Sequence, residues 1–299
     1  MSAAVTKSFS RSRGFNLGIA VATAVAGVLA PMSAAYATPS TVDDRIALSG
    51  NGESLTGTSG GGGGSISWLH NFSSDALAGV AVEHQALANA HWTFGSLNGS
   101  YTFGPGDQRY SVYGEAHEGG GNSGARSIHY RVEALGVVGT YFHRLSVLLE
   151  TRQIDIDTVS GNLPKLGVTY LWNPHFQTSL SYAYSAGGNL GTRLTSGRFD
   201  IYEPAINFLG GFSIGQATAA VLSYVPTALC SDPTLPGCST NVPGTRLKEG
   251  YVGATLPLPR LRSEVSLILD YQNLSSPLVS SKRVQGTLNY VFHIGHHGT

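Results

Sequence analysis

The feature that most constrains this chain is a repeated two-residue alternation of apolar and polar side chains. In segment 284–294, Val284, Leu288 and Phe292 fall on one face of an extended strand, and Gln285 and Asn289 fall on the other. Successive side chains of a strand point to opposite faces, so such a segment has one apolar and one polar face. The same pattern recurs in segments 262–272 and 176–185. The sequence therefore predicts an all-β protein.

About fourteen strands are expected, with twelve to sixteen possible, because the first segment is weak and segment 211–224 breaks the alternation. The predicted strands are 44–50, 63–71, 76–85, 92–103, 109–117, 127–141, 143–153, 165–173, 176–185, 196–208, 211–224, 247–257, 262–272 and 284–294.

The joins between these strands alternate between short turns and longer segments rich in Gly, Ser and Asn, such as 50–62, 118–126 and 226–244. Aromatic residues flank the short turns, as Trp172 and Phe176 do. Short turns on one side, long loops on the other and aromatic girdles are typical of transmembrane barrels. Lipid cannot satisfy an open sheet edge, so the sheet must close. We therefore predict a closed antiparallel up-and-down transmembrane β-barrel.

The N-terminus indicates secretion. Lys7, Arg11 and Arg13 precede an uncharged apolar run at 17–30, and small residues at 35 and 37 suit signal-peptidase cleavage. A membrane anchor is the alternative, but the run is shorter than the roughly 20 residues that span a bilayer. We expect residues 1–37 to be a cleaved signal peptide and residues 38–299 to form a barrel in the bacterial outer membrane.

Composition limits the partners. The formal net charge is zero, which argues against nucleic acid because phosphate binding needs an excess of Lys and Arg. The only cysteines, Cys230 and Cys238, lie close together, and an oxidising compartment favours a disulfide between them over a metal site. No cofactor or metal is predicted. The expected partners are outer-membrane lipid, the barrel-assembly machinery and a small solute or exopolysaccharide.

The signal peptide, the alternating hairpins and the last strand resemble Gram-negative outer-membrane β-barrels in general. More narrowly, segments 65–72 (SISWLHNF) and 80–84 (VAVEH), with the size of the chain, resemble YaiO-like barrels. That resemblance implies a link to exopolysaccharide export systems. One departure concerns the last strand, which in these barrels usually ends the chain on an aromatic residue. Here seven residues follow Phe292, so the assembly signal would be internal.

Charged and polar residues on three consecutive predicted strands are the candidate lumen site. If the apolar faces meet lipid, these residues point inward and form a charge ladder: Arg109, Glu115, His117, Arg131, Glu133, Glu150 and Arg152. Such a ladder would orient polar solutes in a constriction or, as the alternative, rigidify the lumen with ion pairs. Glu115, His117 and Ser111 share one face but are spaced along a strand, so no catalytic triad is predicted.

The leading functional prediction is a pore or export channel for small hydrophilic solutes or saccharides. A structural or surface-interaction barrel that works through its outer loops is the second hypothesis. An envelope lipid- or polysaccharide-modifying enzyme is the third.

Overall fold

The structure is a computed structural model and describes residues 43–56, 60–87, 90–105, 108–123, 126–157, 159–223, 238–276 and 280–295. The predicted signal peptide and the predicted disulfide between Cys230 and Cys238 lie outside the described residues and side chains, so both stay predictions.

Nearly all of the described chain is β-strand. The strands are β1 (Asp43–Leu55), β2 (Gly61–Asn71), β3 (Ala76–Leu87), β4 (Ala90–Phe103), β5 (Gln108–Ser123), β6 (Arg126–Tyr141), β7 (Leu145–Ile156), β8 (Val159–Asn173), β9 (Phe176–Tyr184), β10 (Arg193–Tyr202), β11 (Asn207–Ser223), β12 (Cys238–Leu258), β13 (Ser263–Ser275) and β14 (Ser280–Gly295). A short 3₁₀ turn, Pro259–Leu261, joins β12 to β13.

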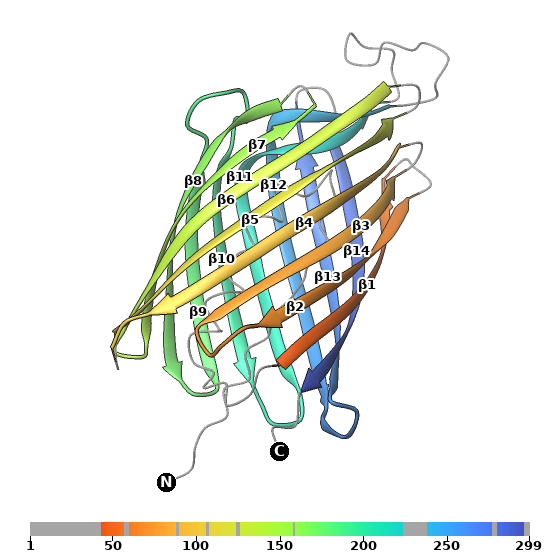
Figure 1. The fold of residues 1–299 in the computed structure, drawn as a ribbon. Coiled ribbons are helices and arrows are strands. Elements are labelled where there is room, and N and C mark those ends of the chain that lie inside the picture. The colour runs from red at the N-terminus through yellow and green to blue at the C-terminus, as the bar shows by residue number, and fades with distance from the viewer. Residues whose placement is uncertain are drawn as a thin grey trace.

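These 14 strands form a closed barrel in which every strand pairs antiparallel with its sequence neighbours and β1 pairs with β14 (Figure 1). The β1–β14 pairing runs from Asp43 opposite Gly295 to Leu55 opposite Arg283. The start of β1 and the end of β14 therefore lie at the same rim of the barrel. That rim also carries the short connections 72–75, 142–144, 174–175 and 203–206. We call it the turn rim and the opposite end the loop rim. The predicted closed 14-stranded barrel is confirmed.

The hairpins at the loop rim are longer than the sequence predicts. Segment 118–126 was expected to be a loop, yet β5 continues to Ser123 and β6 begins at Arg126. Likewise β1 and β2 pair through Glu53 and Gly61. A tilted strand crosses a bilayer with about 9–11 residues, so strands of 16 residues, such as β5 and β6, extend beyond the membrane. The Gly-rich segments outside the membrane pair without needing an apolar face.

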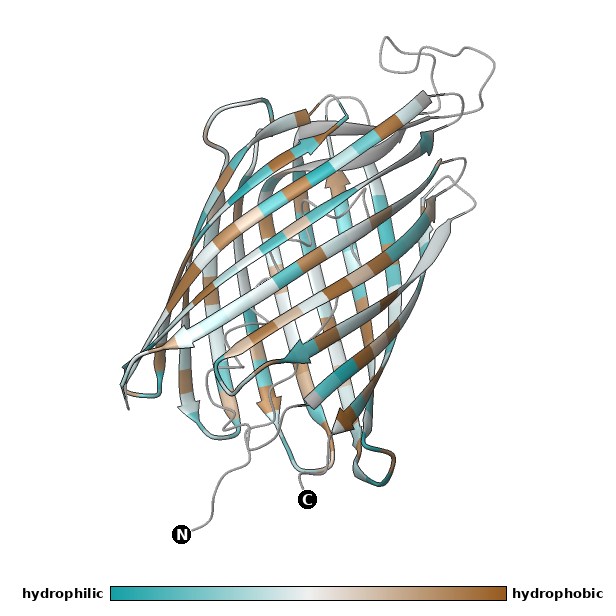
Figure 2. Cartoon of the chain, in the orientation of Figure 1, coloured by the Kyte–Doolittle hydropathy of each residue, from teal (hydrophilic) through white to brown (hydrophobic). Residues whose placement is uncertain are grey.

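The outer wall is apolar in a way that suits lipid. Leu148 is 0% exposed, whereas the next residue, Leu149, is 61% exposed, and this two-residue alternation of exposure runs along β7. Figure 2 shows hydrophobic and hydrophilic residues interspersed along the strands. Large exposed side chains such as Leu97, Leu180 and Val252 continue the band around the barrel. Soluble monomers rarely expose apolar patches beyond a few hundred Å². Among the described residues, no helix is long and apolar enough to cross a membrane.

The loop between β9 and β10, residues 185–192, folds back onto the start of β8. The backbone N–H groups of Ala186 and Asn189 donate to the carbonyls of Asn162 and Ser160, both at 2.8 Å. In return the Ser160 N–H donates to the Asn189 side-chain oxygen at 2.8 Å. These bonds hold the loop in place, and its Leu190 is completely buried.

This arrangement makes a sharp prediction for two neighbouring glycines. Gly188 has φ +68°, and a Cβ there would lie 1.9 Å from the Ser160 carbonyl oxygen, whereas Gly187 has φ +77° and open space around it. Gly188→Ala should detach the loop and speed hydrogen exchange at the Ala186 and Asn189 amides. Gly187→Ala carries the same left-handed backbone cost and is the control. Equal exchange in the two variants would contradict the loop geometry.

The lipid band makes a second prediction on one strand. Leu149→Arg should destabilise the barrel by about 2–4 kcal/mol if Leu149 lies near the bilayer midplane, because a charge there loses its hydration. Gln153→Arg, on the same face of β7 but closer to the loop rim, should cost about 1 kcal/mol or less. Urea unfolding in liposomes measures both. An equal loss in the two variants would contradict this placement of the membrane.

Candidate functional site

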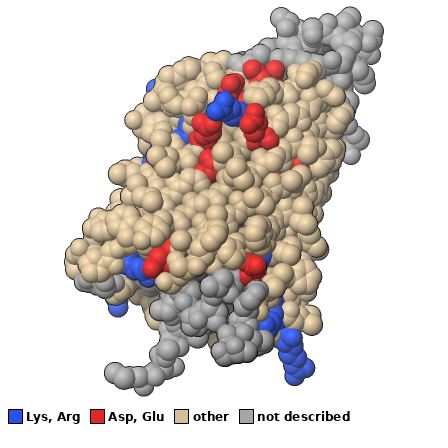
Figure 3. Space-filling model, in the orientation of Figure 1, with Lys and Arg blue, Asp and Glu red and all other residues tan. Residues whose placement is uncertain are grey.

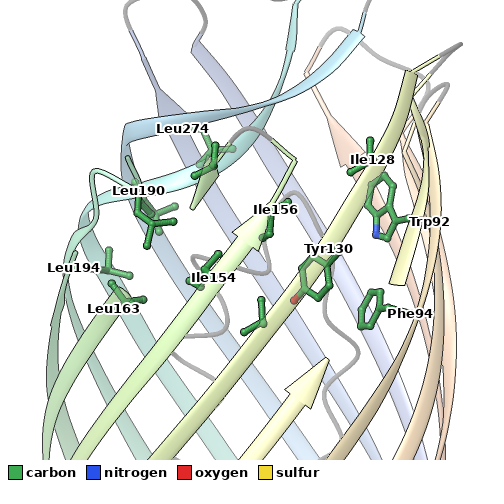
Figure 4. Packing of buried hydrophobic residues seen from close by; sticks show 14 of the residues in the cluster. Trp92, Phe94, Ile128, Tyr130, Ile154, Ile156, Leu163, Leu190, Leu194 and Leu274 are labelled. Atoms are coloured by element: carbon green, nitrogen blue, oxygen red, sulfur yellow. The ribbon is translucent and has the colours of Figure 1, made fainter. Parts of the chain in front are cut away.

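The inside of the barrel carries a layer of packed apolar side chains near the loop rim, which we call the apolar ring. Its buried side chains contact one another and come from β1, β4, β6–β13 and the 185–192 loop (Figure 4). Its members are Leu55, Ala90, Trp92, Phe94, Ile128, Tyr130, Val132, Ile154, Ile156, Val159, Leu163, Ala183, Leu190, Leu194, Ala217, Leu247 and Leu274.

Glycines on β5 make room for the largest members of the apolar ring. Gly119 and Gly121 lie directly opposite Phe94 and Trp92 of β4. A Cβ at either glycine would approach the Cβ of that aromatic residue to 2.4–2.5 Å. The two aromatic side chains therefore lie against bare backbone. Phe94 in turn packs against Tyr130 of β6 with a ring-centroid distance of 5.1 Å.

Below the apolar ring, one wall of the lumen carries a network of buried charges, which we call the Arg152 cluster. Arg152 of β7 donates from Nη2 to Glu115 of β5 at 2.5 Å, and its Nε lies 3.4 Å from a Glu150 oxygen. The Tyr113 hydroxyl donates to the other oxygen of Glu150. His117 Nε2 lies 3.7 Å from Glu115. Two strands, β5 and β7, thus place their inward side chains on one network.

The Arg152 cluster is balanced in charge. Lys165 of β8 lies directly opposite Glu150 in the register and is buried, so two cations face the carboxylates of Glu115 and Glu150 when His117 is neutral. The Arg152 side chain is 1% exposed. Buried charges need such pairing, because an unpaired ion in a low-dielectric site is costly. Among the described residues, no group of three or more His, Cys, Asp or Glu side chains is arranged to hold a metal ion.

Toward the turn rim the lumen carries small hydroxyl side chains that pair across neighbouring strands, together with the buried Arg198–Asp200 ion pair. Thr140 and Ser146 are 3.0 Å apart, and Thr255 and Ser266 are 2.9 Å apart. A solute moving from the loop rim to the turn rim would therefore meet the apolar ring together with the buried Glu53–Arg283 pair, then the Arg152 cluster, then a polar layer.

The predicted charge ladder divides into three parts. Glu115, His117, Glu150 and Arg152 lie together in the lumen. Arg109 also lies on the inner face of its strand, but close to the turn rim, where it pairs with Asp75 at 2.6 Å.

Arg131 and Glu133 lie on the outer wall, contrary to the prediction that they face the lumen. Their side chains are 56% and 44% exposed and form an ion pair at 2.6 Å. Exposed Glu118 and Asp155 lie opposite Arg131 on the neighbouring strands. Figure 3 shows charges gathered near the loop rim above a largely uncharged face. The outer wall meets water or headgroups there, so it can carry charge.

Two features of the lumen escaped the sequence reasoning. Lys165 alternates with Leu163 and Gly167 on β8, and that spacing could have placed it inward. The apolar ring was not foreseen because its residues were assigned to the lipid face.

Solved structures with a similar fold are outer-membrane channels. The CymD monoaromatic hydrocarbon channel matches with a TM-score of 0.55 and 10% identity, over 86% of this chain and 90% of that one. The Pseudomonas putida toluene transporter TodX matches at 0.52 and 8% identity, over 96% and 97%. A Pseudomonas aeruginosa FadL homologue matches at 0.53 and 9%, over 88% and 92%. No protein-family model and no curated protein sequence matches the chain.

The closed barrel, its apolar outer wall and these shared folds agree on location. The protein is an outer-membrane β-barrel. At these identities the shared fold carries no information about the solute.

The two Arg–Glu pairs, one in the lumen and one on the outer wall, give a matched prediction. Arg152→Met leaves the buried Glu150 and the part-buried Glu115 carboxylates without their shared cation and should cost about 3–5 kcal/mol. Arg131→Met breaks an exposed pair and should change stability little. Urea unfolding in liposomes tests both, and a comparable loss in the two variants would contradict the assignment of the faces.

Proposed function

We propose that this barrel is an outer-membrane channel for small, uncharged solutes whose surface is largely apolar. The observation that carries the proposal is the apolar ring, whose packed side chains occupy the inside of the barrel near the loop rim and would move apart to admit a solute. In outer-membrane barrels the longer loops face the outside of the cell. The ring would therefore be the first lumen surface that an incoming solute meets.

The physical reason is desolvation. An apolar solute that enters an apolar lining gains roughly 25 cal/mol for each Å² of surface removed from water. A sugar entering the same lining would lose hydrogen bonds to water without replacement, at a cost of at least about 1 kcal/mol for each hydroxyl. The apolar ring therefore favours hydrocarbon-like molecules over sugars.

The sequence predicts hydrophilic solutes or an exported saccharide instead. The small hydroxyl pairs near the turn rim and the Arg152 cluster suit that prediction, but both lie beyond the apolar ring on the inward path. The resemblance to YaiO-like barrels stays a prediction. The surface-interaction hypothesis rests on long outer loops, and most loop-rim connections are short because the hairpins extend into them.

The names of the similar structures are compatible with the proposal. CymD is described as a monoaromatic hydrocarbon channel and TodX as a toluene transporter. Those solutes belong to those proteins. The support that this chain itself supplies is the lining of its lumen.

Uptake by whole cells tests the proposal, because the lipopolysaccharide leaflet of an outer membrane resists apolar solutes that a simple phospholipid bilayer admits. Cells that produce the barrel should take up radiolabelled toluene faster than cells with an empty vector. Liposome swelling with small sugars is the second measurement. Rapid sugar entry without faster toluene uptake would contradict the proposal and favour the hydrophilic prediction.

A pair of nearly isosteric changes places the selectivity in the apolar ring. Val132→Thr combined with Val159→Thr adds two hydroxyl groups to the ring and should slow toluene uptake roughly tenfold, since each unpaired hydroxyl opposes contact with an apolar solute. Val138→Thr is the control, because Val138 faces the lumen on the same strand as Val132 but lies outside the ring. Equal slowing by the control would remove the ring from the mechanism.

A further inference from the structure

We propose that the end of the apolar ring nearest Arg152 is a binding site for an uncharged solute. Such a solute has an apolar body and one hydrogen-bond acceptor, such as an ether or ketone oxygen, to which Arg152 donates. The inference rests on the proposed function and narrows it, because it separates an oxygen-bearing solute from a plain hydrocarbon.

Arg152 lies at the boundary between the apolar ring and the charged wall. On its own strand the next inward residue toward the loop rim is Ile154, and directly opposite on β8 is Leu163. Both of these residues belong to the apolar ring. A molecule seated in the ring would therefore rest its lower end against the Arg152 guanidinium.

That guanidinium has a donor to spare. Nη2 is committed to Glu115, and Nε faces Glu150. Within the part of the chain that the structure describes, Nη1 is buried and has no hydrogen-bond partner. Buried polar groups are nearly always paired, and an unpaired one costs free energy that a ligand can recover. Arg can only donate, so the group that completes it is an acceptor.

A second unpaired donor lies higher in the ring. Trp92 is only 4% exposed, and among the described residues its buried indole N–H has no acceptor. Two unsatisfied donors in one apolar lining point to solutes that bring an acceptor.

The charge balance selects against an anion. The Arg152 cluster already pairs two carboxylates with Arg152 and Lys165, so an added carboxylate would have no uncompensated cation to meet. The free energy spent on removing water from that carboxylate would then not be recovered. A neutral acceptor needs only the free N–H, and the apolar ring holds the rest of the molecule.

Trp92 offers a direct binding signal. Trp68 and Trp172 are the other tryptophans, and both are exposed on the outer wall at 46% and 56%. In a Trp68→Phe, Trp172→Phe background, Trp92 fluorescence reports on the lumen. The probes are cyclohexyl methyl ether, ethylcyclohexane and cyclohexanecarboxylate, which do not absorb in the tryptophan range. The first two have the same number of heavy atoms and differ by one oxygen in place of a methylene group.

The measured quantity is the ratio of the dissociation constants for ethylcyclohexane and cyclohexyl methyl ether. This ratio is compared between the Trp68→Phe, Trp172→Phe protein and a further variant of it. The comparison cancels the difference in hydration of the two probes. Glu115→Met combined with Arg152→Met removes a neutral ion pair and should shift the ratio about tenfold against the ether, as expected for a lost hydrogen bond to a charged donor. The matched control is Arg131→Met combined with Glu133→Met on the outer wall, which should leave the ratio unchanged.

The double variant could fail to fold, which loss of heat-modifiable migration on gels would reveal. A second variant then tests the same site. Arg152→Lys keeps the charge but replaces the forked guanidinium by a compact ammonium, whose donors the two carboxylates would occupy. It should shift the ratio in the same direction by several-fold.

The outcomes separate the two proposals. The Arg152 site is refuted if ethylcyclohexane binds and toluene uptake is accelerated, but the ratio of dissociation constants is the same in every folded variant. The proposal of an apolar-solute channel is then unaffected. Tighter binding of cyclohexanecarboxylate than of the ether would also refute it, because the site would then prefer an anion. If neither neutral probe changes Trp92 fluorescence and toluene uptake is not accelerated, the proposed function itself fails.

Discussion

The whole structure depends on the absence of hydrogen-bond partners in lipid. Every backbone N–H and C=O inside the bilayer must find its partner within the protein, and a sheet achieves this only by closing. Here the closure is the pairing of β1 with β14 over their shared length, which removes the last free edge. Closure also sorts the side chains of each strand into an outer and an inner set. From then on, height along the barrel decides whether an outer residue meets lipid or water.

That dependence explains what the sequence predicts well. In β13 and β14 one face meets lipid over most of the strand, so Leu267 and Leu269 alternate with polar partners and the strands can be read directly. The number of strands and the turn rim follow from the same alternation. Near the loop rim no lipid enforces it, and the Gly-rich run beginning at Gly119 looks like a loop although its backbone pairs as strand. Hydrogen bonding between main chains leaves little trace in side-chain types.

The wrong prediction for Arg131 and Glu133 and the failure to foresee the apolar ring have a single cause. Along β6, Arg131 and Glu133 alternate with Tyr130 and Val132, and the rule that apolar residues face lipid would put the two charged residues inside. Beyond the bilayer that rule reverses, because the outer wall is wet and the inner wall is packed. The sequence does not mark the height at which the bilayer ends. Register does: Glu118 and Asp155 stand opposite Arg131 on the outer wall, whereas Glu115 and Arg152 stand opposite Ala134 on the inner wall.

The apolar ring and the Arg152 cluster also depend on each other. An apolar layer above the cluster limits access of water, which lowers the local dielectric and strengthens the pairing of Arg152 with Glu115 and Glu150. The same low dielectric makes an unpaired donor at the boundary costly, and therefore responsive to an acceptor that arrives through the ring. A hydrated sugar would have to shed its water before reaching that donor. An apolar molecule with one oxygen reaches it after a favourable transfer, so the order in which a solute meets the two surfaces is itself a source of selectivity.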